Sequence, residues 1–297
     1  HMLPQVMAVP QTRYQEYISS DRSVFRIAPL SRATINYGWA APMGLELVTG
    51  FDAYNLNHYQ HYFDLLQYGE VQPPRARVWT DLNTVERWDL LDALNVKYLV
   101  TPEPIYPPPA QYEMVVRFED EPTFAFYEGM RPHDLYLYRN RQALPRAFWA
   151  EKVVMVKDLS EAIDQIKSSN LRETAIVLDR EDAESPLPAG GRVAPAPSVL
   201  HASDGHLSLR TQTRDDSFLV ISEVWHPGWR ARLDGRPIDL HQTNLALMGT
   251  WVERGSHVLK LTFRPLFWSW AVKITLIGMT IFFVLVLYQI WRRIQRR

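Results

Sequence analysis

The chain has 297 residues, and its 32 Lys and Arg against 33 Asp and Glu give a net charge of −1. This balance excludes the broad basic surface of a nucleic-acid-binding protein, and the lack of cysteine excludes disulfides, thiolate metal sites and a cysteine nucleophile. Hydrophobic residues make up 46%, enough for packed cores, so we expect one large domain or two of ordinary size before the C-terminal segment.

The first region, residues 1–145, has the pattern of a mixed α/β fold. In two segments the apolar and aromatic residues recur with the periodicity of a helix. Several short apolar runs end at turn residues, which is typical of strands. The predicted helices are Tyr54–Tyr68 and Val85–Leu94, the second capped by Asn83 or Thr84, and the predicted strands are Ser23–Ala28, Val96–Thr101, Tyr112–Phe118, Thr123–Tyr127 and Leu135–Arg139.

Residues 146–184 are predicted to form a strand-helix-strand unit. Ala147–Val156 and Thr174–Leu178 read as strands, with an amphipathic helix at Ser160–Ser168 between them. Because the connections are short, we expect the two strands to be parallel. Residues 185–197 are rich in Pro and Gly and are predicted to be a linker.

Residues 198–264 are predicted to be an antiparallel β-sandwich. The strand-like runs are Ser198–Ala202, His206–Thr213, Ser217–Glu223, Ala231–Leu233, Ile238–His241, Leu245–Val252 and Ser256–Phe263. Asp234-Gly235 is a strong hairpin signal between two of them. The fold class is therefore α+β: a mixed α/β region followed by a small antiparallel sandwich and one C-terminal transmembrane helix.

The segment 265–292 is predicted to cross a membrane. Ile274–Tyr288 carries no charge, and with its aromatic flanks it reaches about 20 residues, enough to cross a hydrocarbon core of about 30 Å. The residues that would anchor it at the two interfaces are Trp268, Trp270, Lys273, Tyr288, Trp291, Arg292 and Arg293. We expect Lys273 to extend to the outer interface, although contact with a neighbouring helix or a lipid phosphate is an alternative.

The basic tail, residues 293–297, predicts the orientation. By the positive-inside rule, Arg292, Arg293, Arg296 and Arg297 lie in the cytoplasm and the large region lies outside it. The N-terminal residues have no pattern of a signal peptide, so we expect further membrane helices upstream. The alternative is a tail-anchored protein with its large region in the cytoplasm, which would require the arginines to cross the membrane.

The C-terminal part of the chain resembles the bacterial YfhO family of polytopic membrane proteins. The positions that carry the resemblance are Trp225, His226, Pro227, Gly228, Trp229, Asp234, Gly235, Asn244, Gly255, His257, Arg264 and Pro265. Upstream, the segments Leu90–Thr101, Leu137–Phe148 and FDAYNLNHYQHYFDLL are also similar to that family.

The resemblance implies the extracytoplasmic region and last helix of a GT-C-type glycosyltransferase in a bacterial plasma membrane. Such enzymes transfer sugar from a polyprenyl-phosphate donor, here to a cell-envelope acceptor, and their catalytic acidic residue lies near the first membrane helices. No catalytic residue or cofactor is therefore assigned to this chain. The implied partners are membrane lipid, the lipid-linked sugar, an envelope glycan, and upstream helices or a membrane partner.

A polar and aromatic cluster is the first candidate binding surface. Its members are Tyr54, Asn55, Asn57, His58, His61 and Tyr62. Amide, imidazole and phenol groups donate and accept hydrogen bonds without net charge, which suits a carbohydrate or a lipid headgroup, although ordinary packing is the alternative. His58 and His61 have no third ligand nearby in the sequence, so no metal site is predicted.

The second candidate surface is formed by Trp225, His226 and Trp229. The tryptophans could stack on sugar rings, with the histidine bonding a hydroxyl or a phosphate. In the structural alternative, Pro227-Gly228 makes a turn and the tryptophans fill the sandwich or lie on the membrane. Two other functions stay open: a non-catalytic envelope glycan-binding module, and a structural subunit of a membrane complex.

Overall fold

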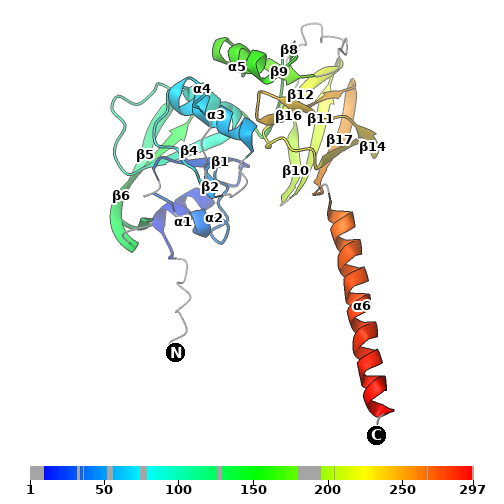
Figure 1. Cartoon of the computed structure of the whole chain (residues 1–297). Coiled ribbons are helices and arrows are strands. Elements are labelled where there is room, and N and C mark those ends of the chain that lie inside the picture. Colours follow the sequence, from blue (N-terminus) through cyan, green and yellow to red (C-terminus); the bar gives the residue numbers. More distant parts are fainter. Residues whose placement is uncertain are drawn as a thin grey trace.

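The computed structural model describes residues 10–31, 34–35, 37–51, 56–73, 79–125, 129–179, 195–203, 205–265 and 267–295. These residues form two lobes that lie side by side, and one long helix leaves the second lobe (Figure 1). The predicted α+β class, with strands in both lobes and a single C-terminal apolar helix, is confirmed.

The N-terminal lobe is built on a four-stranded sheet of order β1-β4-β6-β5. Its strands are β1 (Arg26–Pro29), β4 (Val96–Thr101), β5 (Tyr112–Ala125) and β6 (Gly129–Asn140), with β1 and β4 parallel and the others antiparallel. The other elements are α1 (Arg13–Ser19), α2 (Tyr37–Ala40), α3 (Asn57–Tyr68), α4 (Trp88–Ala93) and the short pair β2 (Gly50–Phe51) and β3 (Trp79–Thr80).

Helix α4 starts later than the sequence predicts. Neither Asn83 nor Thr84 caps it; its N-cap is Arg87, which makes no side-chain cap bond. The N–H groups of Glu86 and Arg87 instead donate to the carbonyl oxygen of Leu66, at 2.9 and 3.0 Å. Because these donors are satisfied by the end of α3, the preceding residues do not need to enter the helix.

The second lobe is a β-sandwich of two sheets. The five-stranded sheet has the order β10-β11-β17-β13-β14 and the six-stranded sheet the order β7-β12-β16-β15-β9-β8. The strands are β7 (Ala147–Trp149), β8 (Lys152–Val156), β9 (Thr174–Leu178), β10 (Ser198–Ser203), β11 (His206–Thr213), β12 (Ser217–Ile221), β13 (Trp229–Leu233), β14 (Arg236–Ile238), β15 (His241–Thr243), β16 (Leu247–Val252) and β17 (Gly255–Phe263). Alternate residues such as Leu209, Leu219 and Leu261 are buried between the sheets.

The strand-helix-strand unit belongs to the six-stranded sheet. Strands β8 and β9 are parallel, as predicted, and α5 (Leu159–Ser168) connects them. The prediction of one strand over Ala147–Val156 is wrong, because β7 pairs with β12 at one edge of the sheet and β8 pairs with β9 at the other. Since β9 also pairs with β15, the predicted units 146–184 and 198–264 share one sheet.

A second predicted strand is also divided. The run Ile238–His241 contributes its first residue to β14 and its last to β15, and these strands belong to different sheets. The chain therefore changes sheets at Asp239 and Leu240, as strands do at the corner of a sandwich. The hairpin at Asp234-Gly235 is confirmed, with φ of +49° and +85° at the two turn residues.

One hydrophobic core spans both lobes. Leu91 and Val96 of the N-terminal lobe belong to the same buried cluster as Ile166, Ile176 and Val220 of the second lobe. The outer face of the six-stranded sheet therefore packs against α5 and the N-terminal lobe, while its inner face packs against the five-stranded sheet. The two lobes form one folded unit.

Helix α6 (Trp268–Ile294) stands outside this unit (Figure 1). It is long and apolar enough to span a membrane. Its large apolar side chains are exposed on every side, for example Ile274 at 67% and Leu287 at 63%. A helix that is apolar all round and uncovered by protein fits a lipid environment.

Candidate functional site

A cleft of about 610 Å³ opens between the two lobes. The N-terminal lobe contributes Asn57 and His58 from the start of α3. The second lobe contributes the segment 157–159, Leu178 at the end of β9, Trp225 in the loop after β12, and the segment 240–242. The cleft thus brings together residues from both surfaces that the sequence marks as candidates.

His58 and Trp225 join the two walls of this cleft. Nε2 of His58 lies 3.0 Å from the carbonyl oxygen of Trp225, and the two rings meet edge to face at 5.9 Å. Because a carbonyl only accepts, Nε2 carries the hydrogen. Burial lowers the pKa of His58, so the ring is neutral at pH 7 and Nδ1 keeps a lone pair. Trp225 is held in turn by its own N–H, which donates to the carbonyl oxygen of Ala246 at 2.8 Å.

The start of α5 forms one side of the cleft. The Asp158 carboxylate caps this helix by accepting from the N–H of Glu161 at 2.9 Å, and the Glu161 carboxylate accepts from the N–H of Lys157 at the same distance. Asp158 is thus a side-chain N-cap, while Glu161 reaches past it to the N–H of the residue before the cap. The two carboxylates satisfy one backbone donor in the first turn of α5 and one just before the helix. Because Lys157 balances Asp158 in charge, this part of the cleft carries no excess positive charge that would favour an anion.

Another part of the cleft lining is formed by the start of β15. His241 and Gln242 are half-buried there, and the side-chain amide of Gln242 donates to the carbonyl oxygen of Leu245 at 2.6 Å. The lining therefore combines imidazole and amide groups with the half-buried Trp225 indole. Such a set binds hydroxyl-rich or amide-bearing ligands by hydrogen bonds and stacking.

Two further residues of the first cluster that the structure describes, His61 and Tyr62, are not among the residues that line the cleft. Tyr62 is fully buried, and its hydroxyl donates to the carbonyl oxygen of Leu90 at 2.7 Å. Burial raises its pKa, and it acts in packing. His61 is half-buried, while Tyr54 and Asn55 lie outside the described residues. Within the described part of the chain, no group of three His, Asp or Glu side chains could hold a metal ion.

His226 and Trp229 lie at the base of α6. Their rings pack edge-on against Phe263, the last residue of β17, at 5.2 and 5.4 Å. Nδ1 of His226 accepts the N–H of Gly228 at 2.9 Å, and the carbonyl oxygen of Gly228 accepts the N–H of Arg264 at the same distance. These contacts fix the chain where it leaves the sandwich for α6. The second candidate surface is therefore not a single site. Trp225 lines the cleft, whereas His226 and Trp229 pack where the chain enters α6.

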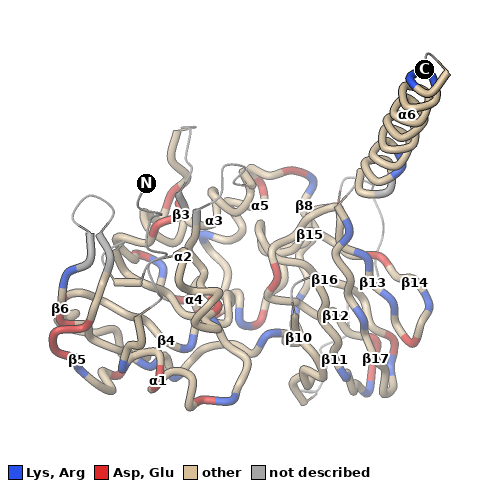
Figure 2. Tube along the Cα trace, turned by 90° about the horizontal axis from the view of Figure 1, so that it is seen from below, with Lys and Arg blue, Asp and Glu red and all other residues tan. Residues whose placement is uncertain are grey.

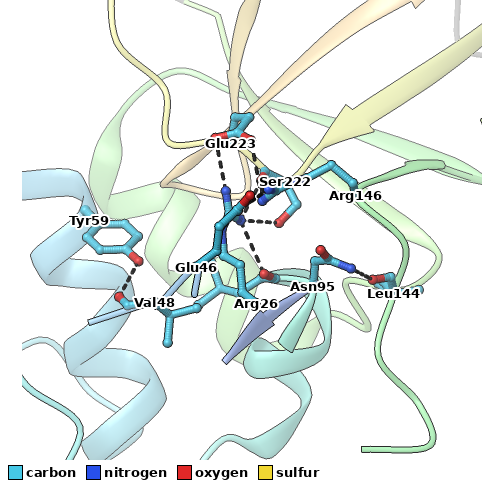
Figure 3. A network of polar contacts seen from close by, with 10 residues as sticks. Arg26, Glu46, Val48, Tyr59, Asn95, Leu144, Arg146, Ser222 and Glu223 are labelled. Atoms are coloured by element: carbon cyan, nitrogen blue, oxygen red, sulfur yellow. Dashed lines mark hydrogen bonds and ion pairs between the residues drawn. The ribbon is translucent and has the colours of Figure 1, made fainter. Parts of the chain in front are cut away.

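A network of charged side chains joins the lobes next to the cleft (Figure 3). Arg26 of β1 donates to the carbonyl oxygen of Ser222 at 2.6 Å and to the Glu223 carboxylate at 3.0 Å. Arg146 contacts Glu46 and lies 3.4 Å from Glu223. The Arg146 side chain is only 2% exposed and that of Arg26 12% exposed. Two largely buried cations thus pair with two carboxylates that are more exposed, Glu223 at 22% and Glu46 at 51%.

This network lies close to both walls of the cleft. Glu223 comes two residues before Trp225, and Tyr59, next to His58, donates its hydroxyl hydrogen to the carbonyl oxygen of Val48 at 2.8 Å (Figure 3). Sequence reasoning missed this network. The available signal is an arginine inside an apolar strand, FRIAP, because a buried cation requires a carboxylate partner.

The predicted anchor residues lie at the two ends of α6. Trp268 and Trp270 are at its start, and Tyr288, Trp291, Arg292 and Arg293 are in its last turns. Nζ of Lys273 lies 5.1 Å from the centre of the Trp270 ring. Lys273 therefore reaches back toward the folded lobes, the direction in which a lysine extends from an apolar core to its interface.

A comparison of the chain with protein-family models, curated proteins and solved structures finds no match.

Proposed function

We propose that this chain is the extracytoplasmic region and C-terminal anchor of a bacterial plasma-membrane protein, and that the cleft between its lobes binds a carbohydrate. The observation that carries the proposal is the contact of His58 with Trp225 inside a cleft. The neutral imidazole of His58 and the amide side chains in the lining can form hydrogen bonds with sugar hydroxyls. The indole of Trp225 offers an apolar ring on which a sugar can stack. The C-terminal arginines lie on the cytoplasmic side.

The resemblance to the YfhO family extends this proposal to a reaction. In that scheme the whole protein transfers sugar from a polyprenyl-phosphate donor to a cell-envelope acceptor. The catalytic acid belongs to a loop outside this chain, and the cleft holds the sugar of the donor or the acceptor. Helix α6 keeps the cleft at a fixed place beside the membrane that supplies the donor.

The first experiment measures sugar binding by the full chain in nanodiscs of neutral phosphatidylcholine. Cell-wall oligosaccharides are titrated while tryptophan fluorescence is followed. We expect Trp225→Ala and His58→Gln each to weaken binding at least about tenfold, since a lost buried hydrogen bond or stacking contact costs roughly 1–3 kcal/mol. His201→Gln, at an exposed position on β10, is the matched control. Unchanged binding in both cleft variants would exclude the cleft as the site.

A glycan-binding module without catalysis would use the same cleft, because the His58–Trp225 contact favours both functions equally. An assay of sugar transfer distinguishes the glycosyltransferase from the binding module. Membranes that contain the full-length protein should move labelled sugar from a polyprenyl-phosphate donor to envelope acceptor only if the reaction is correct. Binding without transfer would leave the binding module as the function.

A further inference from the structure

The outer face of the five-stranded sheet carries cations that point away from the core. In β13, Ala231 and Leu233 are buried between the sheets while Arg230 and Arg232 are exposed. By the same alternation, Lys260 on β17 and Arg210 on β11 face outward. We call these four residues, Arg210, Arg230, Arg232 and Lys260, the basic face. Figure 2 shows Lys and Arg in blue along β13 and β17.

Two of these cations lie directly opposite each other. Arg232 is the cross-strand partner of Lys260 in the antiparallel pair of β13 and β17. Like charges at such positions are about 5 Å apart at their Cβ atoms and destabilise a sheet. Ser208 is the partner of Lys260 on the other side and gives no negative charge. The fold therefore keeps an unfavourable pair on an open surface.

Among the described residues, none of the four cations has an ion-pair partner. Arg230 and Arg232 donate only to backbone carbonyl oxygens, those of Pro227 and Trp229 for the first and that of Gly235 for the second. The Asp234 carboxylate is occupied by His257 at 2.7 Å and by the N–H of Val258 at 2.8 Å. In the N-terminal lobe, by contrast, ion pairs are made by Arg13, Arg26, Lys97, Arg117 and Arg141.

The cations are arranged along the strands that lead to the membrane helix. Arg230 is opposite Thr262, close to the start of α6, whereas Arg210 is opposite Val258, four residues further away. At about 3.4 Å per residue, the basic face extends over roughly 14 Å along β17. Salt limits the attraction of a flat anionic membrane to about 8–10 Å, so a membrane at the level of Arg230 would not reach Arg210 at the other end of the basic face.

We propose that the basic face binds a linear polyanion, a chain with repeated phosphate or carboxylate groups that runs along β13 and β17 beside the membrane. Arg230 and Arg232 are two residues apart on one strand, which spaces their Cβ atoms at about 7 Å. Anionic groups placed between Arg232 and Lys260 would neutralise the like-charge pair. The proposal rests on the sheet face alone and is independent of the sugar site in the cleft.

The test measures binding of fluorescently labelled long-chain polyphosphate to the full chain in neutral nanodiscs, by fluorescence anisotropy. We expect Arg232→Gln with Lys260→Gln to weaken binding at least about tenfold, and binding by the unaltered chain to fall steeply between 50 and 200 mM salt, as counterion release requires. The matched control, Arg22→Gln with Lys152→Gln, removes the same two charges from exposed positions elsewhere. It should leave binding within about twofold of the unaltered chain.

Thermal unfolding separates this role from a structural one. Because the like-charge pair is removed, the Arg232→Gln/Lys260→Gln variant should unfold at the same or a higher temperature while it loses binding. The proposal is overturned if the unaltered chain does not bind polyphosphate, or if both double variants weaken binding equally. It is also overturned if the basic face captures vesicles of anionic phospholipid but not the free polymer.

Discussion

Nη2 of Arg26 lies 3.0 Å from the Glu223 carboxylate, although these residues belong to different lobes and are 197 positions apart in the chain. Arg146 approaches the same carboxylate at 3.4 Å from the second lobe. Glu223 is therefore shared by two nearly buried guanidinium groups. Because Trp225 follows two residues later, we expect the position of this cleft wall to depend on the Glu223 carboxylate.

Removing the shared charge should loosen the junction. Glu223→Gln leaves two buried cations with Glu46 as their remaining carboxylate, so we expect a loss of about 3 kcal/mol in the free energy of unfolding. Denaturant unfolding measures this loss, and faster amide exchange at residues 57–60 and 225–229 would show that the cleft walls are released.

The control for this variant is Glu113→Gln. Glu113 pairs with Arg141 at 2.7 Å, but their side chains are 48% and 63% exposed. A surface pair of this kind contributes at most about 1 kcal/mol. Equal losses of unfolding free energy in the two variants would show that the inter-lobe network stabilises the fold no more than a surface ion pair does.

The carboxylate of Asp92 should make stability depend on pH. Burial raises its pKa to about 6, although Asn140 donates to it at 2.6 Å and Arg172 at 3.3 Å. The folded state therefore keeps the proton that the unfolded state loses near pH 4. Stability from this group is present below about pH 4 and is lost as the pH rises through about 6.

Comparison with Asp92→Asn isolates this contribution. The difference in unfolding free energy between the unaltered chain and the variant should change by about 1–3 kcal/mol between pH 4 and pH 7, with the unaltered chain relatively weaker at pH 7. Urea titrations at several pH values measure this difference. A constant difference over that range would contradict the raised pKa.

Gly228 should be required where the chain passes to α6. A Cβ there would lie 2.7 Å from the carbonyl oxygen of Arg264 and 2.8 Å from the Phe263 ring. We expect Gly228→Ala to cost about 1–3 kcal/mol, since the backbone cannot move away without breaking the bond between Gly228 and Arg264. Gly50→Ala is the control, because nothing lies within 4 Å of its Cβ. Thermal unfolding of both variants tests this, and a stable Gly228→Ala variant would refute it.

Asn244 combines an unusual backbone angle with a buried hydrogen bond. Its φ is +48°, it is fully buried, and its side-chain oxygen accepts the N–H of Ile176 at 2.8 Å. Asn244→Ala should cost about 2–4 kcal/mol through both effects. Asn244→Gly keeps the angle accessible and loses only the bond, so its cost should be smaller. Equal costs, measured by denaturant unfolding, would show that the backbone angle contributes nothing.

Local patterns in the sequence predict many elements but not their partners. β4 and β9 are found at the predicted residues, because each is an apolar run that ends at turn residues. The run over Ala147–Val156 contains no turn signal, yet it divides between the two edges of one sheet. Its division follows from backbone bonds that Ala150 makes with Phe218 and Lys152 with Glu173. Those partners are distant in the chain, so periodicity does not reveal them.

The candidate site shows the same limit. Residue chemistry selects both His58 and Trp225, but their contact across 167 positions depends on how the lobes pack. Similarly, Trp225 and Trp229 look equivalent in the sequence and differ only because Trp229 is opposite Phe263 in the sheet. The chemistry of a tyrosine side chain suits a binding role, but Tyr62 lies on the inner side of α3 and is fully buried in the core.

The position of β17 has a mechanical consequence. It is bordered by β11 along eight residue pairs and by β13 along five, and its end leads through Arg264 and Pro265 into α6 (Figure 1). A pull on α6 along the direction of β17 would therefore load both sets of hydrogen bonds in shear. A terminal strand at the edge of a sheet would be held by only one such set. Helix α6 is thus attached to a strand that is held on both sides.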